Sequence, residues 1–300
     1  MRNINVFRLA LSVIFLTFFT ADGFSQTKGW EDVEKIIGKT GKLQGDVFKI
    51  TFPRSDLNVK VAGVKIEPAL ALTGWIAFKK MGSNAMLMGD MVLLETEVEP
   101  AMKKAVENGL EITALHNHVL KETPQVIYMH VGGMGSPTEL AQKIKSVISQ
   151  TKIPLTQPKQ NQTVQSKTDW SKVQSILGTK GQMAGDILQI SVPREDKVTE
   201  NGDEIPTSMG MATSLYFQKV KDKAVTTGDF VLIGEEVNPV IKALVQHNIA
   251  VTAVHNHMLS DNPRIFFLHF WGNDTPENLA KGLKDAIFKT KSKTETTSSK

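Results

Sequence analysis

The hydrophobic residues of this 300-residue chain follow the same order of helical and strand-like spacings twice. Trp30, Val33 and Ile36 recur at helical spacing, and the glycine at position 38 ends this segment as a helix-terminating glycine would. Alternation over 47–52, ended by a proline, is typical of a strand. The pattern therefore predicts a helix and then a strand at the start of each unit, over 30–37 and 47–52 and again over 170–177 and 187–192.

The rest of each unit predicts two strands, a helix that tolerates proline in its first turn, two more strands and a last helix. These segments cover 70–78, 86–94, 97–108, 110–116, 125–131 and 138–149 in the first unit, and 209–217, 225–233, 236–248, 249–255, 264–270 and 276–289 in the second. The order α-β-β-β-α-β-β-α predicts an α+β fold with two homologous tandem domains, each a largely antiparallel sheet with flanking helices.

The two units form an internal repeat that can be followed residue by residue. Trp30 recurs as Trp170, an offset of 140 residues, and after a small gap the offset is 139. Each unit is long enough to bury its own core, so we predict domains at 26–150 and 170–290 that fold independently. The segment 151–169 is rich in Gln, Pro, Thr, Ser and Lys and predicts a flexible linker, and 291–300 predicts a disordered basic tail.

The N-terminal residues have the pattern of a signal peptide, which we place at 1–25. Arg2 and Arg8 precede an apolar run over 9–19, and small and polar residues follow. The run is too short to span about 30 Å of hydrocarbon, so we predict export to the periplasm or the extracellular space, with a hydrophobic anchor as the alternative.

Composition and charge exclude several classes of site. The chain has no cysteine, which excludes disulfides, zinc-thiolate sites and an acylated N-terminal cysteine, so we expect no stable membrane anchor. Its net charge of +4 lies partly in the lysine-dotted tail from Lys281 to Lys300. Phosphate recognition needs basic residues clustered on a folded face, so we expect no nucleic-acid partner. The chain also lacks a Gly-x-Ser-x-Gly motif and a P-loop.

Six of the seven histidines share one spacing, in which His-Asn-His is followed twelve residues later by a third histidine. Residues i and i+2 of a strand lie on one face about 6.5–7 Å apart, and a hairpin can bring the third histidine alongside. Three imidazoles are typical of a catalytic zinc with one open position, whereas structural sites usually close all four. We therefore predict a divalent metal, zinc foremost, in each domain, held by His116, His118 and His130 and by His255, His257 and His269.

Nickel, copper, iron or manganese could take the same ligands, and hydrogen-bonded structural histidines are the alternative to a metal site. The residues after each His-Asn-His differ widely between the units, Val119 to Thr123 against Met258 to Asn262. All three histidines are nevertheless present in both units, which favours metal binding.

Two glutamates precede the histidines at the start of predicted helices. Glu97 and Glu236 are candidates for a fourth ligand or for a general base that takes a proton from water at the metal. The alternative is a carboxylate at a helix N-terminus that interacts favourably with the helix dipole.

Other charged residues recur without requiring a functional role. Arg54 and Arg194 each follow a proline, and we expect them in solvent at strand ends, with anion binding as the alternative. The aspartates that follow glycine, including Asp90 and Asp229, are explained by turn formation.

The segments 228–232 (Gly-Asp-Phe-Val-Leu), 237–239, 255–258 (His-Asn-His-Met) and 269–272 together resemble the LppY/LpqO family of bacterial secreted lipoproteins, and the resemblance extends over both units. It implies an exported two-unit protein. Because this chain lacks the cysteine of the lipoprotein members, a lipid anchor is not expected.

The histidine hairpin alone is similar to the zinc site of acetolactate decarboxylase and of related zinc ester hydrolases. The similarity implies zinc at His255, His257 and His269 and at their first-unit counterparts. It covers only the hairpin, its second gap differs, and a Gly-Gly before the last histidine is missing.

These patterns predict an exported metal-dependent hydrolase or lyase that acts on a small molecule. The alternatives are a non-catalytic extracytoplasmic module that binds a metal or a ligand, and a structural scaffold. The sequence does not choose the substrate, the metal or the oligomeric state.

Overall fold

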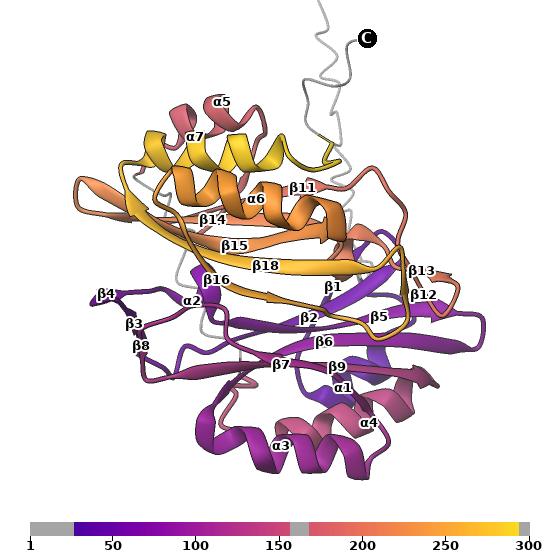
Figure 1. Cartoon of the computed structure of the whole chain (residues 1–300). Coiled ribbons are helices and arrows are strands. Elements are labelled where there is room, and N and C mark those ends of the chain that lie inside the picture. The colour runs from indigo at the N-terminus through magenta and orange to yellow at the C-terminus, as the bar shows by residue number, and fades with distance from the viewer. Residues whose placement is uncertain (1–26, 157–167, 294–300) are drawn as a thin grey trace, which may run out of the picture.

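The computed structural model describes residues 27–156 and 168–293. Figure 1 shows four layers: the helices of the first repeat, its sheet, the sheet of the second repeat, and the helices of the second repeat. The predicted α+β fold of two similar, largely antiparallel units is confirmed.

The first repeat contains a six-stranded antiparallel sheet of order β1-β2-β5-β6-β9-β7 and a small sheet of order β4-β3-β8. Its elements are α1 (Glu31–Ile37), β1 (Lys42–Gln44), β2 (Val47–Pro53), β3 (Lys60–Val61), β4 (Val64–Lys65), α2 (Pro68–Ala71), β5 (Thr73–Met81), β6 (Asn84–Leu94), α3 (Glu95–Glu107), β7 (Glu111–His116), β8 (Glu122–Thr123), β9 (Val126–Gly135) and α4 (Pro137–Ile148).

The second repeat has the same topology, with sheets of order β10-β11-β14-β15-β18-β16 and β13-β12-β17. Its elements are α5 (Ser171–Leu177), β10 (Gln182–Ala184), β11 (Ile187–Pro193), β12 (Thr199–Glu200), β13 (Asp203–Glu204), the 3-10 helix η1 (Thr207–Met209), β14 (Ala212–Val220), β15 (Lys223–Ile233), α6 (Gly234–Gln246), β16 (Ala250–His255), β17 (Asp261–Asn262), β18 (Ile265–Asp274) and α7 (Pro276–Ile287).

Each long predicted helix and strand is present, and the differences are local. The strand predicted from residue 70 begins at Thr73, because Pro68 starts the short helix α2 just before it. The three-residue strands β1 and β10 and the two-residue strands were not predicted, since such short segments have too few residues to show a period.

Each repeat buries one core between its helices and its sheet. In the first repeat Trp30 stacks on Phe48 with ring centroids 5.2 Å apart, and the helix α4 packs against α1 and α3. Trp170 and Phe217 occupy the matching core of the second repeat. The sides of the helices and of the sheet that face each other are both apolar, so the packing of helices on sheet follows from the sequence pattern of one unit alone.

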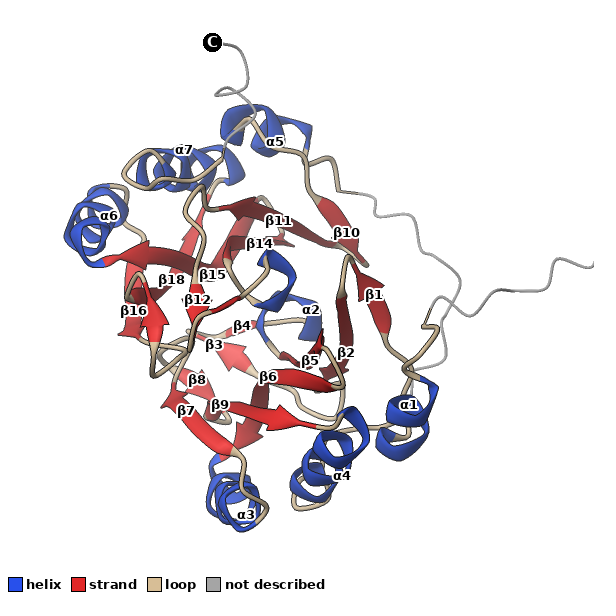
Figure 2. Cartoon of the chain, turned by 90° about the vertical axis from the view of Figure 1, so that its right-hand side faces the viewer, coloured by secondary structure: helices blue, strands red, loops and turns tan. Residues whose placement is uncertain are grey.

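Two further apolar clusters join the repeats. One contains Met88 of the first repeat with Val231 and Phe267 of the second, and the other contains Val92 of the first with Val225 of the second. The inner faces of the two large sheets therefore pack against each other. Figure 2, turned by 90°, shows the sheets enclosing a common interior, with β7 beside β16 at one side.

Burial on both faces explains why the central strands β6 and β15 are almost continuously buried rather than alternating. Each isolated unit would expose the apolar inner face of its sheet, which disfavours the predicted independent folding of the units.

The described ends of the predicted linker and tail are attached to the repeats. The backbone N–H of Lys152 donates to Glu97 at 2.8 Å, and that of Lys291 donates to Glu236 at the same distance. Ile153 is buried in the first core. The predicted signal peptide and most of the predicted linker and tail lie outside the described residues. Within the described part of the chain, no helix is both long and apolar enough to cross a membrane.

Candidate metal centre

The histidines lie where the last two strands of each large sheet end. His116 is the last residue of β7, and the antiparallel register of β7 and β9 places Ala114 opposite His130. The second repeat repeats this arrangement, with Ala253 opposite His269. The hairpin predicted from the spacing thus brings the third histidine alongside, although His118 and its counterpart His257 lie beyond the strand ends rather than on them.

The six histidines form one cluster between the sheets instead of two separate triads. The closest ring contacts run between repeats: His116 with His255 at 3.5 Å between centroids, His130 with His257 at 3.7 Å, and His118 with His269 at 3.9 Å. Packing of the sheets face to face brings the two hairpins together, so the prediction of one triad in each domain does not describe the arrangement.

The groups whose ligand atoms could hold one ion draw on both repeats. His116, His118 and His269 form one such group, and His116, His130 and His257 form a second, with the ligand atoms of each within 4.8 Å of one another. A third group combines Asp90 with two histidines of the first repeat, His118 and His130.

Several of these ligand atoms are buried without a hydrogen-bond partner. They are His116 Nε2, His118 Nε2, His130 Nε2, both ring nitrogens of His257, and Asp90 Oδ1. Buried polar atoms are nearly always hydrogen-bonded, so buried lone pairs that lie close together without partners are suited to accept a metal ion. The donor set therefore fits a divalent metal that accepts nitrogen and oxygen, such as zinc.

The two repeats do not contribute equally. In the second repeat His269 Nδ1 contacts the carbonyl oxygen of Gly228 at 3.0 Å, and its Nε2 lies 2.8 Å from Nε2 of His255. The counterparts His116 and His130 have no such bond between them, and their Nε2 atoms stay free. The first repeat thus supplies most of the available ligand atoms.

Burial keeps the imidazoles neutral. It lowers the pKa of His116 to about 3 and that of His255 to about 4, and neighbouring imidazoles add to the effect at His116. The pKa values of the other four, His118, His130, His257 and His269, lie well below the usual value, mainly through burial. A neutral imidazole has the free lone pair that metal binding requires.

Asp90 and Asp229, which the sequence pattern attributes to turns, lie next to this cluster. Asp90 lies on β6 opposite His130, with its carboxylate oxygens 3.6 Å from His130 Nε2 and 3.8 Å from His118 Nε2. Asp229 is opposite His269 on β15 and β18. Burial raises the pKa of Asp90 to about 8, with a contribution from Asp229, and raises that of Asp229 to about 7. The signal in the sequence was their position in the middle of a predicted strand, where a turn is excluded.

An inner chamber of about 280 Å³ opens beside the cluster. Its lining combines residues of both repeats: His118, Asp90, Tyr128 and Lys49 from the first, and His257, Asp229, Gln189 and Tyr216 from the second, among others. A larger cavity of about 850 Å³ shares part of this lining and adds the ends of β1 and β10. The two cavities share Lys49, Gln189 and Tyr216 in their linings, and the histidines line only the smaller one.

Lys49 is the basic residue of the chamber lining. Its ammonium group donates to the carbonyl oxygen of Ser208 at 3.1 Å and lies 4.1 Å from the ring centroid of Trp75. Burial lowers its pKa to about 8, against the opposing effect of Asp90 and Asp229. Gln189 occupies the equivalent position in the second repeat, so the chamber carries this charge on one side only.

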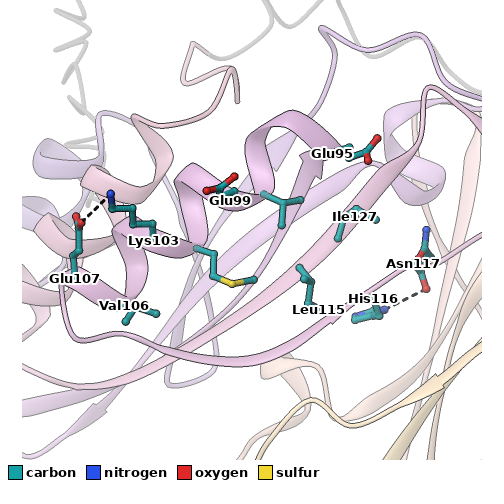
Figure 3. Close-up of a pocket in the computed structure, with 11 residues that line it drawn as sticks. Glu95, Glu99, Lys103, Val106, Glu107, Leu115, His116, Asn117 and Ile127 are labelled. Carbon is teal, nitrogen blue, oxygen red and sulfur yellow. Dashed lines mark hydrogen bonds and ion pairs between the residues drawn. The ribbon is translucent and has the colours of Figure 1, made fainter.

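A separate groove of about 830 Å³ runs along the outside of the first repeat between α3 and β7. Figure 3 shows His116 and Asn117 at one end of it, next to Leu115 and Ile127, with the Lys103–Glu107 ion pair at the other end. The groove is largely apolar and contains one histidine, whereas the inner chamber contains two histidines and both aspartates. The chamber is therefore the better candidate for chemistry.

The catalytic assignment of Glu97 and Glu236 requires correction. Glu97 is the third residue of α3 and accepts the backbone N–H of Leu94 at 2.9 Å, as in a capping box. Its carboxylate also accepts from Arg54 Nη1 at 2.7 Å and from the backbone N–H of Lys152. Glu236 has the same set of partners in the second repeat. Neither belongs to a group that could hold a metal. The alternative of a carboxylate at a helix N-terminus describes both.

The arginines expected in solvent are instead buried. Arg54 is fully buried and forms ion pairs with Asp56 and Glu97, and Arg194 pairs in the same way with Asp196 and Glu236. The paired carboxylates and a backbone carbonyl oxygen accept most of the N–H groups of each guanidinium, and only Nε of Arg194 has no partner. These arginines therefore connect a strand end to a helix start and are not free to bind an anionic ligand.

The chain matches the sequence profile of a family described as Domain of Unknown Function (DUF1259) over residues 31–150 and again over 171–289. None of the curated proteins matches.

Similar solved structures include the trimeric bacterial microcompartment shell protein PduB, at 11% identity and a TM-score of 0.23, covering 84% of this chain and 93% of that one. EtuB from Clostridium kluyveri is 7% identical with a TM-score of 0.20, covering 83% and 90%, and TP0453 is 10% identical with a TM-score of 0.19, covering 83% and 96%. Likenesses this weak support no argument about fold or function.

Proposed function

This chain belongs to the DUF1259 family, with the family's domain present twice, and we propose from its site that it is a metal-dependent enzyme, a hydrolase or a lyase that acts on a small molecule. The observation that supports the proposal most strongly is the convergence of unpartnered imidazole nitrogens from both repeats beside a polar chamber. We propose zinc as the metal, because the ligand set is mainly nitrogen with one carboxylate. The similarity of the histidine hairpin to the zinc site of acetolactate decarboxylase supports the same choice.

In this proposal the histidines hold the ion and the chamber holds the substrate. A bound divalent ion would supply Lewis acidity, which polarises a carbonyl group or lowers the pKa of water. Asp229 accepts and returns the proton, because its carboxylate lines the chamber next to the histidines and belongs to no metal-compatible group, whereas Asp90 is the carboxylate of the ligand set. Lys49 orients an electronegative group of the substrate, and the apolar clusters around the chamber limit its access to water.

The proposal also includes the location of the protein and the type of its partner. The N-terminal pattern and the resemblance to the LppY/LpqO family support an exported protein that is released after signal-peptide removal and has no stable membrane anchor. Its partner is a small molecule and not a nucleic acid, since the polar chamber is enclosed between two sheets.

The test uses the untagged chain from Gln26 to the C-terminus. Its metal content is measured as purified, after chelation and after zinc is restored. The three forms are then screened against carboxylic esters and 2-hydroxy-2-methyl-3-oxo acids. We expect turnover that disappears with chelation and returns with zinc, and an activity that is equal in all three forms would refute the role of the metal.

The substitution Asp229→Asn, with Asp186→Asn as its control, tests whether a carboxylate of the chamber handles the proton. Asp229 lines the chamber but belongs to no metal-compatible group, so Asp229→Asn should keep zinc and lower kcat by roughly 10²- to 10⁴-fold, the usual contribution of a general acid or base. Asp186→Asn, at an exposed turn of the same Gly-Asp type, is the matched control and should behave as the unsubstituted chain. Unchanged turnover in Asp229→Asn would remove this residue from the mechanism.

A non-catalytic binding module is the second candidate. The deep burial of the site favours it, because His130, His257 and His269 are 2%, 4% and 1% exposed. Under this alternative the chain binds zinc, no screened compound turns over above the chelated form, and Asp229→Asn changes ligand affinity only.

A further inference from the structure

A cavity of about 360 Å³, distinct from the polar chamber, is also lined by His257. Four methionines line it, Met86, Met88 and Met134 from the first repeat and Met258 from the second. Met86 and Met134 are directly opposite each other on β6 and β9, and Met88 follows on the same face of β6. We call this space the methionine cavity.

The methionine cavity ends at an unsatisfied ligand. His257 is 4% exposed, and neither of its ring nitrogens has a hydrogen-bond partner. Since His257 also lines the polar chamber, it lies between two spaces of different chemistry. One space offers carboxylates and a lysine, and the other offers thioethers.

The rim of the methionine cavity is acidic. Glu111 of the first repeat and Glu200 and Asp203 of the second line it, and no lysine or arginine does so among the residues the structure describes. The pKa of Glu200 is raised, mainly by burial and in small part by the charge of Glu111. Acidic groups of different repeats therefore gather at the opening, which attracts cations and repels anions.

The four methionines of the cavity have no methionine counterparts at the equivalent positions of the other repeat. The internal repeat relates Met86, Met88, Met134 and Met258 to Val225, Thr227, Asn273 and Val119, none of which is a thioether. Val225 and Val119 pack in the apolar cluster on the other side, so the same position in the sandwich is filled there without methionine. Packing alone consequently does not require thioethers here.

We propose that the methionine cavity binds a soft monovalent cation, Cu(I), through the thioethers of Met88 and Met258 and the ring of His257. Thioether and imidazole ligands select Cu(I) over harder ions, and the acidic rim brings cations to the opening. The site shares His257 with the proposed zinc centre but does not depend on zinc binding or on an enzymatic activity.

The test measures how well the chain retains Cu(I) against bathocuproine disulfonate under anaerobic conditions, after zinc has been removed by chelation, because one of the proposed zinc groups also uses His257. The variant Met88→Leu/Met258→Leu is compared with Met209→Leu/Met211→Leu. The four substituted methionines belong to one buried cluster, but only Met88 and Met258 line the cavity. Leucine conserves the volume of methionine, so both variants should fold, and circular dichroism verifies this.

We expect the cavity variant to retain Cu(I) about tenfold less well or worse, the control variant to match the unsubstituted chain, and X-ray absorption to show sulfur neighbours only when the cavity methionines are present. Equal retention by both variants, or no retention by the unsubstituted chain, would overturn the proposal. His116→Ala separates the two sites: a loss of zinc with Cu(I) retained leaves this inference standing, and the presence or absence of zinc in the unsubstituted chain tests the zinc centre alone.

Discussion

His116 and His255 offer a matched pair of substitutions that tests the arrangement of the metal centre. They are equivalent in the repeat, each ends its strand, and their rings stack at 3.5 Å. Each also has its Nδ1 next to the carbonyl oxygen of the following asparagine. His116 nevertheless belongs to both all-histidine groups, whereas His255 belongs to none.

The size of the effect follows from the number of ligands. Zinc binding in small structural sites is worth about 10–16 kcal/mol over four ligands, or about 3–4 kcal/mol for each. The loss of one ligand therefore weakens zinc binding by roughly 10²- to 10³-fold. We expect up to this loss in His116→Ala, which leaves only the group of Asp90, His118 and His130 intact, and a change of less than about tenfold in His255→Ala.

The same groups set the stoichiometry. Every pair among the three groups shares a histidine, so only one of them can be filled at a time, and the chain should bind one zinc ion rather than two. Titration with zinc against a competing chelator, together with elemental analysis, measures both quantities. Circular dichroism verifies that the variants are folded. Two ions per chain, with equal losses in His116→Ala and His255→Ala, would refute the shared centre and restore one site in each repeat.

Three further expectations concern stability. Glu97→Gln should lower the free energy of unfolding by about 1.5–3 kcal/mol, because buried Arg54 loses one of its two carboxylate partners and keeps only Asp56. Zinc content should be unchanged, as measured by urea unfolding and elemental analysis, and a stable variant that loses zinc would contradict the structural role. In the metal-free chain the pKa values of His116 and His255, about 3 and about 4, lie below the 6.5 of the unfolded chain. The other four clustered histidines also have lowered pKa values, whereas the raised pKa values of Asp90 and Asp229 act in the opposite direction. Because the six imidazoles outnumber the two carboxyls, the unfolded chain binds more protons, stability should fall as the pH drops below about 6.5, and urea midpoints that are equal at pH 7 and pH 5 would contradict this. A fragment of residues 27–156 should aggregate or bind a dye specific for apolar surface unless it is produced together with residues 168–293, and a monomeric, cooperatively unfolding fragment would show that the inner core is dispensable.

Some features of the fold are set by neighbouring residues, and others are set by the packing of distant segments. The helix from residue 31 and the strand from residue 47 could be predicted because their periodicity is a property of consecutive residues. The internal repeat and the histidine hairpin were visible for the same reason. The capping role of Glu97 was also encoded locally, since it lies three residues after Leu94 at the helix start.

The location of the site was decided by tertiary structure. Each sheet has a second apolar face, and the sequence of one unit does not say whether that face meets solvent, a helix or the other sheet. Once the two inner faces pack together, His116 contacts His255 and Asp90 becomes buried. The sequence by itself therefore identified the six histidines and the strands that hold them. The packing of the two repeats, driven by the burial of those inner faces, decided that the six histidines meet in one place.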